Sequence, residues 1–162
     1  VVRAFDQPAE AGKFDAVICV GNSLALAEDL PVVHAALGQM LAALRPGGIC
    51  IAGVLNLWSL PPGTTVWQKC MRVDYQRADH ILLKSIHRCG DQGHVSFVDL
   101  DLSRPDLSPR YDAAEVLGIE ADDMRAAVDA HGGVEPVFYG SFRFEPYDPQ
   151  DSGDLILTCR RA

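Results

Sequence analysis

Two nearly uninterrupted apolar runs, each about as long as a strand, stand on either side of one helical stretch. The first run covers residues 14–20 and the second covers residues 49–55. Between them, apolar side chains recur at the spacing of one helix face, at Val33, Leu37, Met40, Leu41 and Leu44. Continuous apolar runs are typical of strands buried on both faces of a parallel sheet. Strand, helix, strand is the order of a parallel crossover, so the sequence predicts an α/β fold with a doubly wound sheet.

The boundaries of the helical stretch carry recognisable signals. Asp29 is a good N-cap residue, and Pro31 fits the first turn of a helix. At the other end, Arg45-Pro46-Gly47-Gly48 cannot continue a helix, and Gly48 opens the second apolar run. We therefore expect a helix between Asp29 and Arg45.

The segment after the second run has a different pattern. Residues 56–75 contain the breaker Pro61-Pro62-Gly63, and we expect them to be irregular. Two strand-like runs, 80–89 and 94–102, flank the loop residues 90–93. The sequence therefore predicts an antiparallel hairpin, inserted after the second buried strand.

The last part of the chain returns to helix and strand. A helix is predicted near residues 121–131, where Gly132-Gly133 ends it and the inward side chains are Met124, Ala127 and Val128. The β-rich runs 134–144 and 155–159 are joined by a polar loop. These two runs are predicted to form a closing hairpin.

Composition limits the classes of protein that this chain can be. Its 162 residues, 48% of them apolar, suffice for one globular domain or part of one. No apolar run is long enough to span a bilayer, and the first residues lack the pattern of a secretory leader. The five cysteines are scattered without a CxxC pair, which is typical of reduced thiols. We therefore expect a cytoplasmic protein without a membrane partner, and the formal net charge of −8 disfavours nucleic acid.

Two short segments match motifs of a known superfamily. Residues 14–24 read FDAVICVGNSL, and residues 44–48 read LRPGG. The first resembles the fourth strand and following turn of class I S-adenosylmethionine-dependent methyltransferases, particularly the glycine and sarcosine N-methyltransferase-like group. The second is similar to the LxPGG turn that precedes the fifth strand in the same superfamily.

This resemblance implies a particular part of a larger fold. Strands four, five, seven and six of a Rossmann-like methyltransferase sheet would be present, with an insertion at about 57–118 after the fifth strand. Residues 1–4 would be the tail of the third strand, and residues 1–162 a partial methyltransferase domain. The glycine-rich loop that grips the cofactor in this superfamily is absent from the sequence. The resemblance therefore implies methyl transfer only as part of a longer chain.

A cofactor site is expected at the carboxyl end of the first apolar run. Ligands of open α/β sheets bind beyond the carboxyl ends of strands, where the strand order reverses. Gly21 would let the backbone approach a ligand closely. The resemblance implies S-adenosylmethionine as this cofactor, held by Phe5, Asp6, Val20 and Gly21. A plain strand-to-helix turn stays open as the alternative, since Gly-Asn is ordinary turn chemistry.

Asn22 is the predicted catalytic residue, because its side chain offers both a donor and an acceptor to orient a small-molecule methyl acceptor. The predicted substrate-binding residues are Asn22, Asn56, Trp58 and Tyr75. In glycine N-methyltransferases an arginine beside such an asparagine holds the substrate carboxylate, whereas this chain has Leu55-Asn56. Glycine is therefore a poor candidate for the acceptor.

Other functions find less support in the sequence. His80, His87 and His94 recur every seven residues without a nearby CxxC or HxxxH, so no metal site is predicted. Ser23 lacks the GxSxG pattern of a serine hydrolase, and the GxGxxG loop of a nicotinamide-binding domain is equally absent. A non-catalytic binding or scaffold domain with a methyltransferase-like fold stays open as the alternative to methyl transfer.

Overall fold

The predicted strand, helix and strand form one side of a mixed sheet in the computed structural model, which describes residues 4, 7–8 and 10–162. Strand β1 (Phe14–Cys19) pairs in parallel with β2 (Leu44–Leu55), and α1 (Leu30–Ala43) lies between them in the sequence. Asp29 caps α1, because its Oδ1 accepts a hydrogen bond of 2.9 Å from the amide of Val32. The α/β crossover and the start of its helix are therefore present as predicted.

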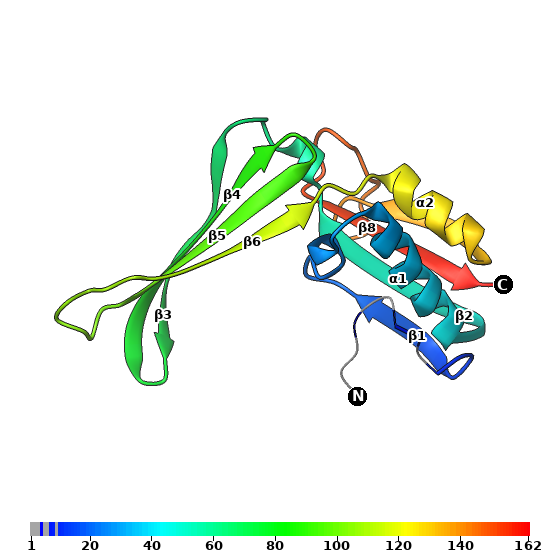
Figure 1. Ribbon diagram of the computed structural model, residues 1–162, viewed down its shortest axis with the longest axis horizontal. Coiled ribbons are helices and arrows are strands. Elements are labelled where there is room, and N and C mark those ends of the chain that lie inside the picture. The colour runs from blue at the N-terminus through cyan, green and yellow to red at the C-terminus, as the bar shows by residue number, and fades with distance from the viewer. Residues whose placement is uncertain (1–3, 5–6, 9) are drawn as a thin grey trace. The chain divides into compact units, whose positions relative to one another are not determined.

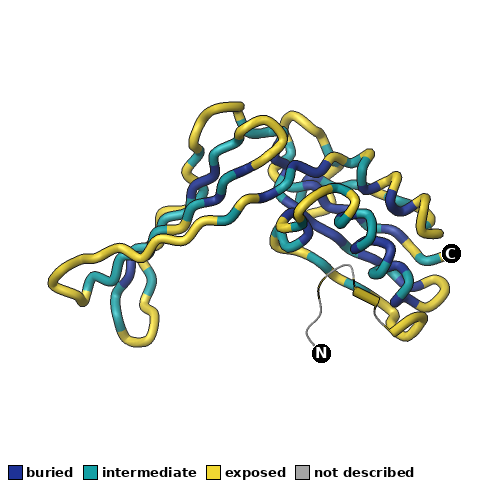
Figure 2. Tube along the Cα trace, viewed as in Figure 1, coloured by how far each residue is buried: buried dark blue, intermediate teal, exposed yellow. Residues whose placement is uncertain are grey.

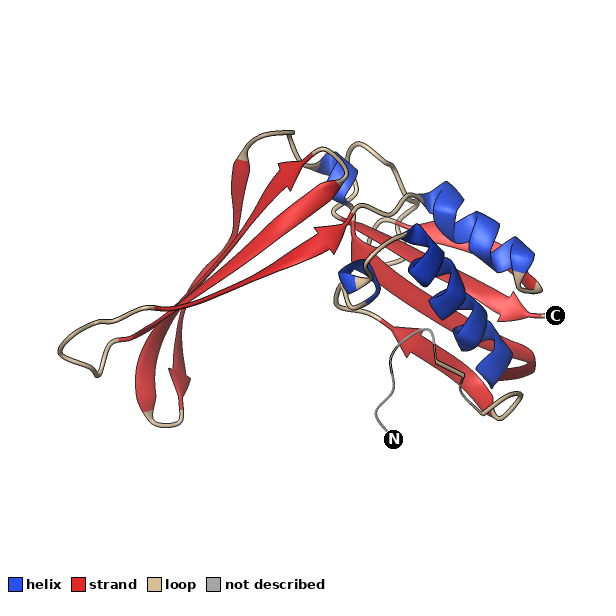
Figure 3. Cartoon of the chain, viewed as in Figure 1, coloured by secondary structure: helices blue, strands red, loops and turns tan. Residues whose placement is uncertain are grey.

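Two further strands complete this sheet. β8 (Asp154–Arg161) pairs antiparallel with β2, and β7 (Gly133–Tyr139) pairs antiparallel with β8. The order in the sheet is β1-β2-β8-β7 (Figures 1 and 3). The closing hairpin is present, but its strands differ in length from the predicted runs. β8 is longer than the run 155–159, whereas β7 ends at Tyr139 and residues 140–153 form the connecting loop.

Two helices, α1 and α2 (Ala121–Ala130), cover the same face of this sheet (Figure 1). α2 begins with a capping box, in which Glu120 and Asp123 bond each other's backbone amides. The predicted inward residues of α2 are fully buried, and they pack with α1 over the middle of β2 and β8 (Figure 2). This core includes Leu37, Leu41, Ala52, Met124, Ala127, Val128, Leu155 and Leu157.

The prediction that residues 14–20 are buried on both faces is wrong for this chain. Ile18 is 63% exposed and Val20 is 39% exposed, although both are apolar. In the described part of the chain, helices cover one face of the sheet only, and β1 pairs on one edge only, with β2. An apolar strand therefore lies at the edge of the sheet, where unpaired backbone groups can accept another strand.

The second compact unit comprises Leu60–Val116, and the first comprises Val1–Ser59 with Leu117–Ala162. The second unit contains an antiparallel sheet in the order β3-β4-β5-β6. Its strands are β3 (Thr65–Tyr75), β4 (Ala78–Cys89), β5 (Gln92–Asp101) and β6 (Arg110–Leu117), the last of which extends one residue beyond the unit. The predicted hairpin is present as β4 and β5, with a tighter turn at Gly90-Asp91.

The prediction that residues 56–75 are irregular is wrong for β3. Polar residues alternate along this strand, and most of its positions are exposed, so no apolar run marks it. Gln76 and Arg77 form the turn to β4 with φ values of 53° and 67°. Glycine or asparagine usually occupies such positions, so the turn carried no recognisable signal. In the part of the chain that the structure describes, no helix is long and apolar enough to cross a membrane.

Candidate functional site

The turn after β1 is held in a left-handed conformation and joined to the end of β2. Gly21 and Asn22 have φ values of 77° and 69°. Asn22 Oδ1 accepts a hydrogen bond of 2.5 Å from the amide of Leu55, the last residue of β2. Asparagine tolerates this backbone region better than most residues, and its short side chain can bond nearby backbone. The turn therefore fixes the carboxyl ends of two parallel strands side by side.

A short 3₁₀ helix, η1 (Leu24–Leu26), holds the other side of this turn. The amide of Ala25 donates to the carbonyl oxygen of Asn22 at 3.1 Å, and the Ser23 hydroxyl donates to the Val20 carbonyl at 3.3 Å. Leu24 is fully buried and anchors η1 in the core. The backbone around Asn22 is thus fixed from both sides.

The surroundings of Gly21 are open. A Cβ atom added to Gly21 would meet no described atom within 4 Å, so its positive φ and not crowding favours glycine there. Val20 beside it is 39% exposed. Burial raises the pKa of the Cys19 thiol, which keeps it protonated near neutral pH. The backbone at Gly21 is therefore accessible to a ligand, and the adjoining side chains are uncharged.

Asn56 directly follows β2 and is fully buried. Its Nδ2 donates to the carbonyl oxygens of Pro149 and Ser152 at 2.9 and 2.8 Å. Its Oδ1 accepts from the Trp58 amide at 3.2 Å and from the Tyr147 hydroxyl at 3.3 Å. All the donor and acceptor positions of this amide are thus used inside the chain. Asn56 joins the loop between β7 and β8 to the end of β2.

Two residues that the sequence did not single out lie at the same end of the sheet. Asp154 begins β8 and pairs with Leu55, and partial burial raises the pKa of its carboxyl group. Burial first, and then the charges of Glu120 and Asp148, raise the pKa of Tyr147. Asp154 stands just before an apolar run, a position that could have drawn notice. Tyr147 carries no signal in the sequence.

The raised pKa of Asp154 predicts a pH-dependent gain from Asp154→Asn. The folded state binds the Asp154 proton more tightly than the unfolded state does. The stabilisation that this protonated carboxyl group provides is therefore present at low pH, and it is lost as the pH rises through the pKa of Asp154 in the folded state. At pH 7 the ionised carboxylate therefore destabilises the fold, and D154N should have the higher free energy of unfolding. In urea titrations, that gain should shrink as the pH falls through the raised folded pKa, and it should be gone by about pH 4, the ordinary pKa of an aspartate. The exposed neighbour Asp151 provides the control D151N, and equal effects of both variants at all pH values would contradict this.

The structure brings together five of the predicted site residues within the first unit. Val20, Gly21 and Asn22 lie beside the end of β2, where Asn56 and Trp58 follow. Asn22 Oδ1 accepts the hydrogen bond from the Leu55 amide, so Asn22 Nδ2 is the group that can donate to a ligand. Phe5 and Asp6, predicted to bind the cofactor, lie outside the described residues.

Tyr75, predicted to bind the substrate, belongs to the second unit. It ends β3, is 60% exposed, and lies edge-on to the His80 ring at 6.0 Å between ring centroids. It lines a groove of about 310 Å³ together with His80 and Asp99. His80 Nδ1 lies 2.7 Å from Asp99 Oδ1. Among the described residues, no three histidine, cysteine or acidic side chains are placed to hold a metal ion.

Comparison with known proteins shows which solved structures have a similar fold. No protein-family model and no curated protein sequence matches the chain. The solved structure of CalS10 with bound S-adenosylmethionine, an amino pentose methyltransferase of Micromonospora echinaspora, is similar at a TM-score of 0.72 and 16% identity. The CcbJ methyltransferase of Streptomyces caelestis is similar at 0.74 and 15%, and the sugar N-methyltransferase KedS8 of a Streptoalloteichus species at 0.71 and 21%.

These alignments cover nearly all of this chain but only part of each neighbour. They include 98%, 100% and 97% of this chain, against 62%, 63% and 60% of CalS10, CcbJ and KedS8. The chain therefore spans less than two thirds of the proteins that it resembles. At these identities the likeness shows the fold, an α/β fold similar to Rossmann-like methyltransferases.

Proposed function

We propose that this chain forms the acceptor-facing part of an S-adenosylmethionine-dependent methyltransferase that acts on a small molecule. The observation that carries the proposal is the joined end of β1 and β2, where Asn22 bonds Leu55 beside the open Gly21 backbone. This arrangement lies at the carboxyl ends of parallel strands in a fold that solved methyltransferases share. In this proposal β1, β2, β7 and β8 are the fourth, fifth, sixth and seventh strands of that fold.

The described residues fit one side of the cofactor. The open backbone at Gly21 and the exposed Val20 would lie against it, without a Cβ at Gly21 to keep it away. No Gly-x-Gly tripeptide occurs in the sequence, so the cradle for the rest of the cofactor is not among these residues. S-adenosylmethionine supplies an activated methyl group and a good leaving group, so the protein's task is alignment.

The acceptor would be oriented by the side chains at the strand ends. Asn22 Nδ2 can donate to a polar atom of the acceptor, since its Oδ1 already holds Leu55. Asp154, opposite Leu55, can accept the proton that an amine must lose before it attacks. Holding the reacting atoms in line can lower the activation free energy of methyl transfer by about 7–11 kcal/mol. The names of CalS10 and KedS8 make amino sugars the first acceptors to test.

Gly21→Ala tests the cofactor side of this proposal. Gly12 is a matched control, because it also has a positive φ, 67°, and open surroundings. Alanine in this backbone region costs about 1–2 kcal/mol, so G21A and G12A should lose similar stability. In the longest natural polypeptide that contains these residues, G21A should weaken S-adenosylmethionine binding at least tenfold in calorimetry, and G12A should not. Equal binding by both variants would place the cofactor elsewhere.

A non-catalytic binding or scaffold domain is the second candidate function. The exposed apolar edge strand β1 favours it, because the unpaired backbone groups of such a strand can pair with another chain. The proposed methyltransferase would act as part of a longer chain, so residues 1–162 alone should bind S-adenosylmethionine weakly or not at all. Micromolar affinity of these 162 residues in calorimetry would contradict that part of the proposal.

A further inference from the structure

Two cysteines of the first unit lie directly opposite each other in adjacent strands. Cys50 of β2 pairs with Cys159 of β8 in the antiparallel register. Cys50 is fully buried and Cys159 is 2% exposed. They share a face of the sheet with Ala52 and Leu157, the pair two positions further along the ladder, which is also buried. The two thiols therefore lie together in the core of this unit.

The backbone arrangement of this pair suits a disulfide. Residues directly opposite each other in antiparallel strands have Cα atoms about 4.5 or 5.5 Å apart, depending on their place in the hydrogen-bond ladder. Disulfides join cysteines whose Cα atoms are about 4.4–6.8 Å apart. Cys50 and Cys159 are both free thiols in this structure. A disulfide can therefore join them while β2 and β8 keep their present register.

The two thiols shift each other's protonation in opposite directions. The hydrogen bond with Cys50, which outweighs burial, lowers the pKa of the Cys159 thiol. The same hydrogen bond, and then burial, raise the pKa of the Cys50 thiol. Cys50 is therefore the donor of this bond, and Cys159 is the member of the pair that more readily becomes a thiolate. The thiolate is the form of cysteine that reacts with oxidants.

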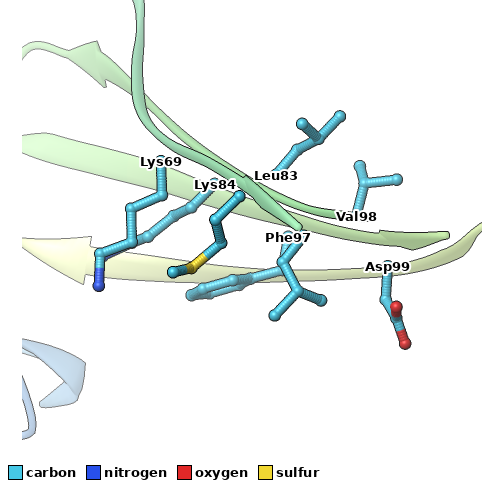
Figure 4. A pocket seen from close by; sticks show the side chains of 8 residues that line it. Lys69, Leu83, Lys84, Phe97, Val98 and Asp99 are labelled. Atoms are coloured by element: carbon cyan, nitrogen blue, oxygen red, sulfur yellow. The ribbon is translucent and has the colours of Figure 1, made fainter. Parts of the chain in front are cut away.

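The other three cysteines have different neighbours. Cys70 pairs with Leu83, and so it lies on the side of the second sheet where Figure 4 shows Leu83 and Val98. Cys89 ends β4 at an exposed position, and Cys19 is opposite an alanine of β2. In the described part of the chain, only the pair in β2 and β8 places two thiols directly opposite each other.

We propose that Cys50 and Cys159 form a reversible disulfide, which acts as a redox switch on the stability of the first unit. The second unit lies between these cysteines in the sequence, so the disulfide would close a loop of roughly 110 residues. A disulfide that closes a long loop restricts the unfolded chain strongly and so favours the folded state. Oxidation would tie together Val1–Ser59 and Leu117–Ala162, the two segments of the first unit. This inference is independent of the proposed methyl transfer.

The oxidant is a hydroperoxide, in the simplest case hydrogen peroxide, which is small enough to reach a buried pair when the sheet opens locally. The Cys159 thiolate attacks one peroxide oxygen, and the O–O bond breaks to give a sulfenic acid and a hydroxide, which takes up a proton to form water. The Cys50 sulfur then attacks the sulfenic sulfur, and its proton leaves with the sulfenic hydroxyl group as a second water. Two thiols are oxidised by two electrons, and one peroxide is reduced to two waters. A dithiol reductant restores both thiols.

Peptide mapping after oxidation tests the pairing directly. The longest natural polypeptide that contains these residues carries C70S/C89S, which removes both exposed thiols of the second unit. It is oxidised with hydrogen peroxide in its folded state, and the remaining thiols are alkylated. Cleavage after Glu28 separates Cys19 from Cys50, so mass spectrometry identifies each link. We expect a link between Cys50 and Cys159 that dithiothreitol removes. A link between Cys19 and Cys50 instead, or no link in the folded chain, would overturn the proposal.

Urea unfolding of the oxidised and reduced forms tests the effect on stability. The oxidised form should unfold at a midpoint about 1 M or more above that of the reduced form. C159A prevents the link and should abolish this difference, whereas the matched control C19A should keep it. If circular dichroism shows that C159A does not fold, the two forms of C19A decide alone, because they differ only in the link. An oxidised form that carries the link and unfolds at the same midpoint as the reduced form would overturn the switch.

Discussion

Asn56→Ala should lower the free energy of unfolding by about 3–4 kcal/mol, a large effect for one side chain. The Asn56 amide makes four hydrogen bonds inside the chain and is fully buried. Its removal leaves two carbonyl oxygens, an amide and a hydroxyl without these partners, and each such buried group costs about 1–3 kcal/mol unless water reaches it. Urea unfolding followed by far-ultraviolet circular dichroism measures the loss.

The control for this variant lies in the same loop. Gln150 is exposed, and Gln150→Ala should change the free energy of unfolding by less than about 0.5 kcal/mol. If N56A instead loses less than about 1 kcal/mol, the loop between β7 and β8 is not held by this side chain. Asn56 would then be free to bind substrate, as its position in the sequence suggested.

Asn22→Gly should lower methyl transfer about 100-fold or more in the longest natural polypeptide that contains these residues. Glycine adopts the φ of 69° without strain, so the variant removes the side chain and leaves the backbone conformation allowed. The loss of the bond to Leu55 loosens the joined strand ends, and a displacement of about 1 Å in a site can cost 100-fold in rate. The measurement is the turnover of radiolabelled S-adenosylmethionine with an amino-sugar acceptor.

Asn22→Asp separates the two tasks of this residue. Aspartate tolerates positive φ and keeps an oxygen for the Leu55 amide, but it lacks the amide donor. N22D should therefore keep a free energy of unfolding near that of the unchanged protein and still lose at least tenfold in turnover. Full turnover in N22D would show that Asn22 serves only to hold the strand ends, without touching the acceptor.

The elements that the sequence predicted well are those that bury one continuous apolar face. The helices at 30–43 and 121–130 show helical spacing and end at capping or breaking residues, and both were anticipated. β3 and β6 were not anticipated, because strands with polar residues on exposed positions look like loops. The turn at Gln76-Arg77 adopts positive φ without glycine or asparagine, so it gave no warning of a hairpin.

Within the candidate site, the residues that could be predicted are those whose role depends on nearby sequence, and the others depend on contacts with distant segments. Gly21-Asn22 was recognisable because turn chemistry and strand position are local properties. Asn56 was predicted to bind substrate, yet its amide is occupied by carbonyls 93 and 96 residues further along the chain. These carbonyls reach Asn56 only because the loop between β7 and β8 folds back to the end of β2. Asp154 was not predicted for the same reason, since only the pairing of β8 with β2 brings it beside Leu55 at the carboxyl end of β2.

The most direct test of the proposed function is transfer of a labelled methyl group. The longest natural polypeptide that contains these residues is incubated with methyl-labelled S-adenosylmethionine and a panel of small acceptors that includes amino-sugar nucleotides. We expect the label to enter one small-molecule acceptor, with an equal amount of S-adenosylhomocysteine formed and one proton released per methyl group. Binding of S-adenosylmethionine without transfer to any acceptor, or no binding by that polypeptide, would contradict it and favour the non-catalytic domain.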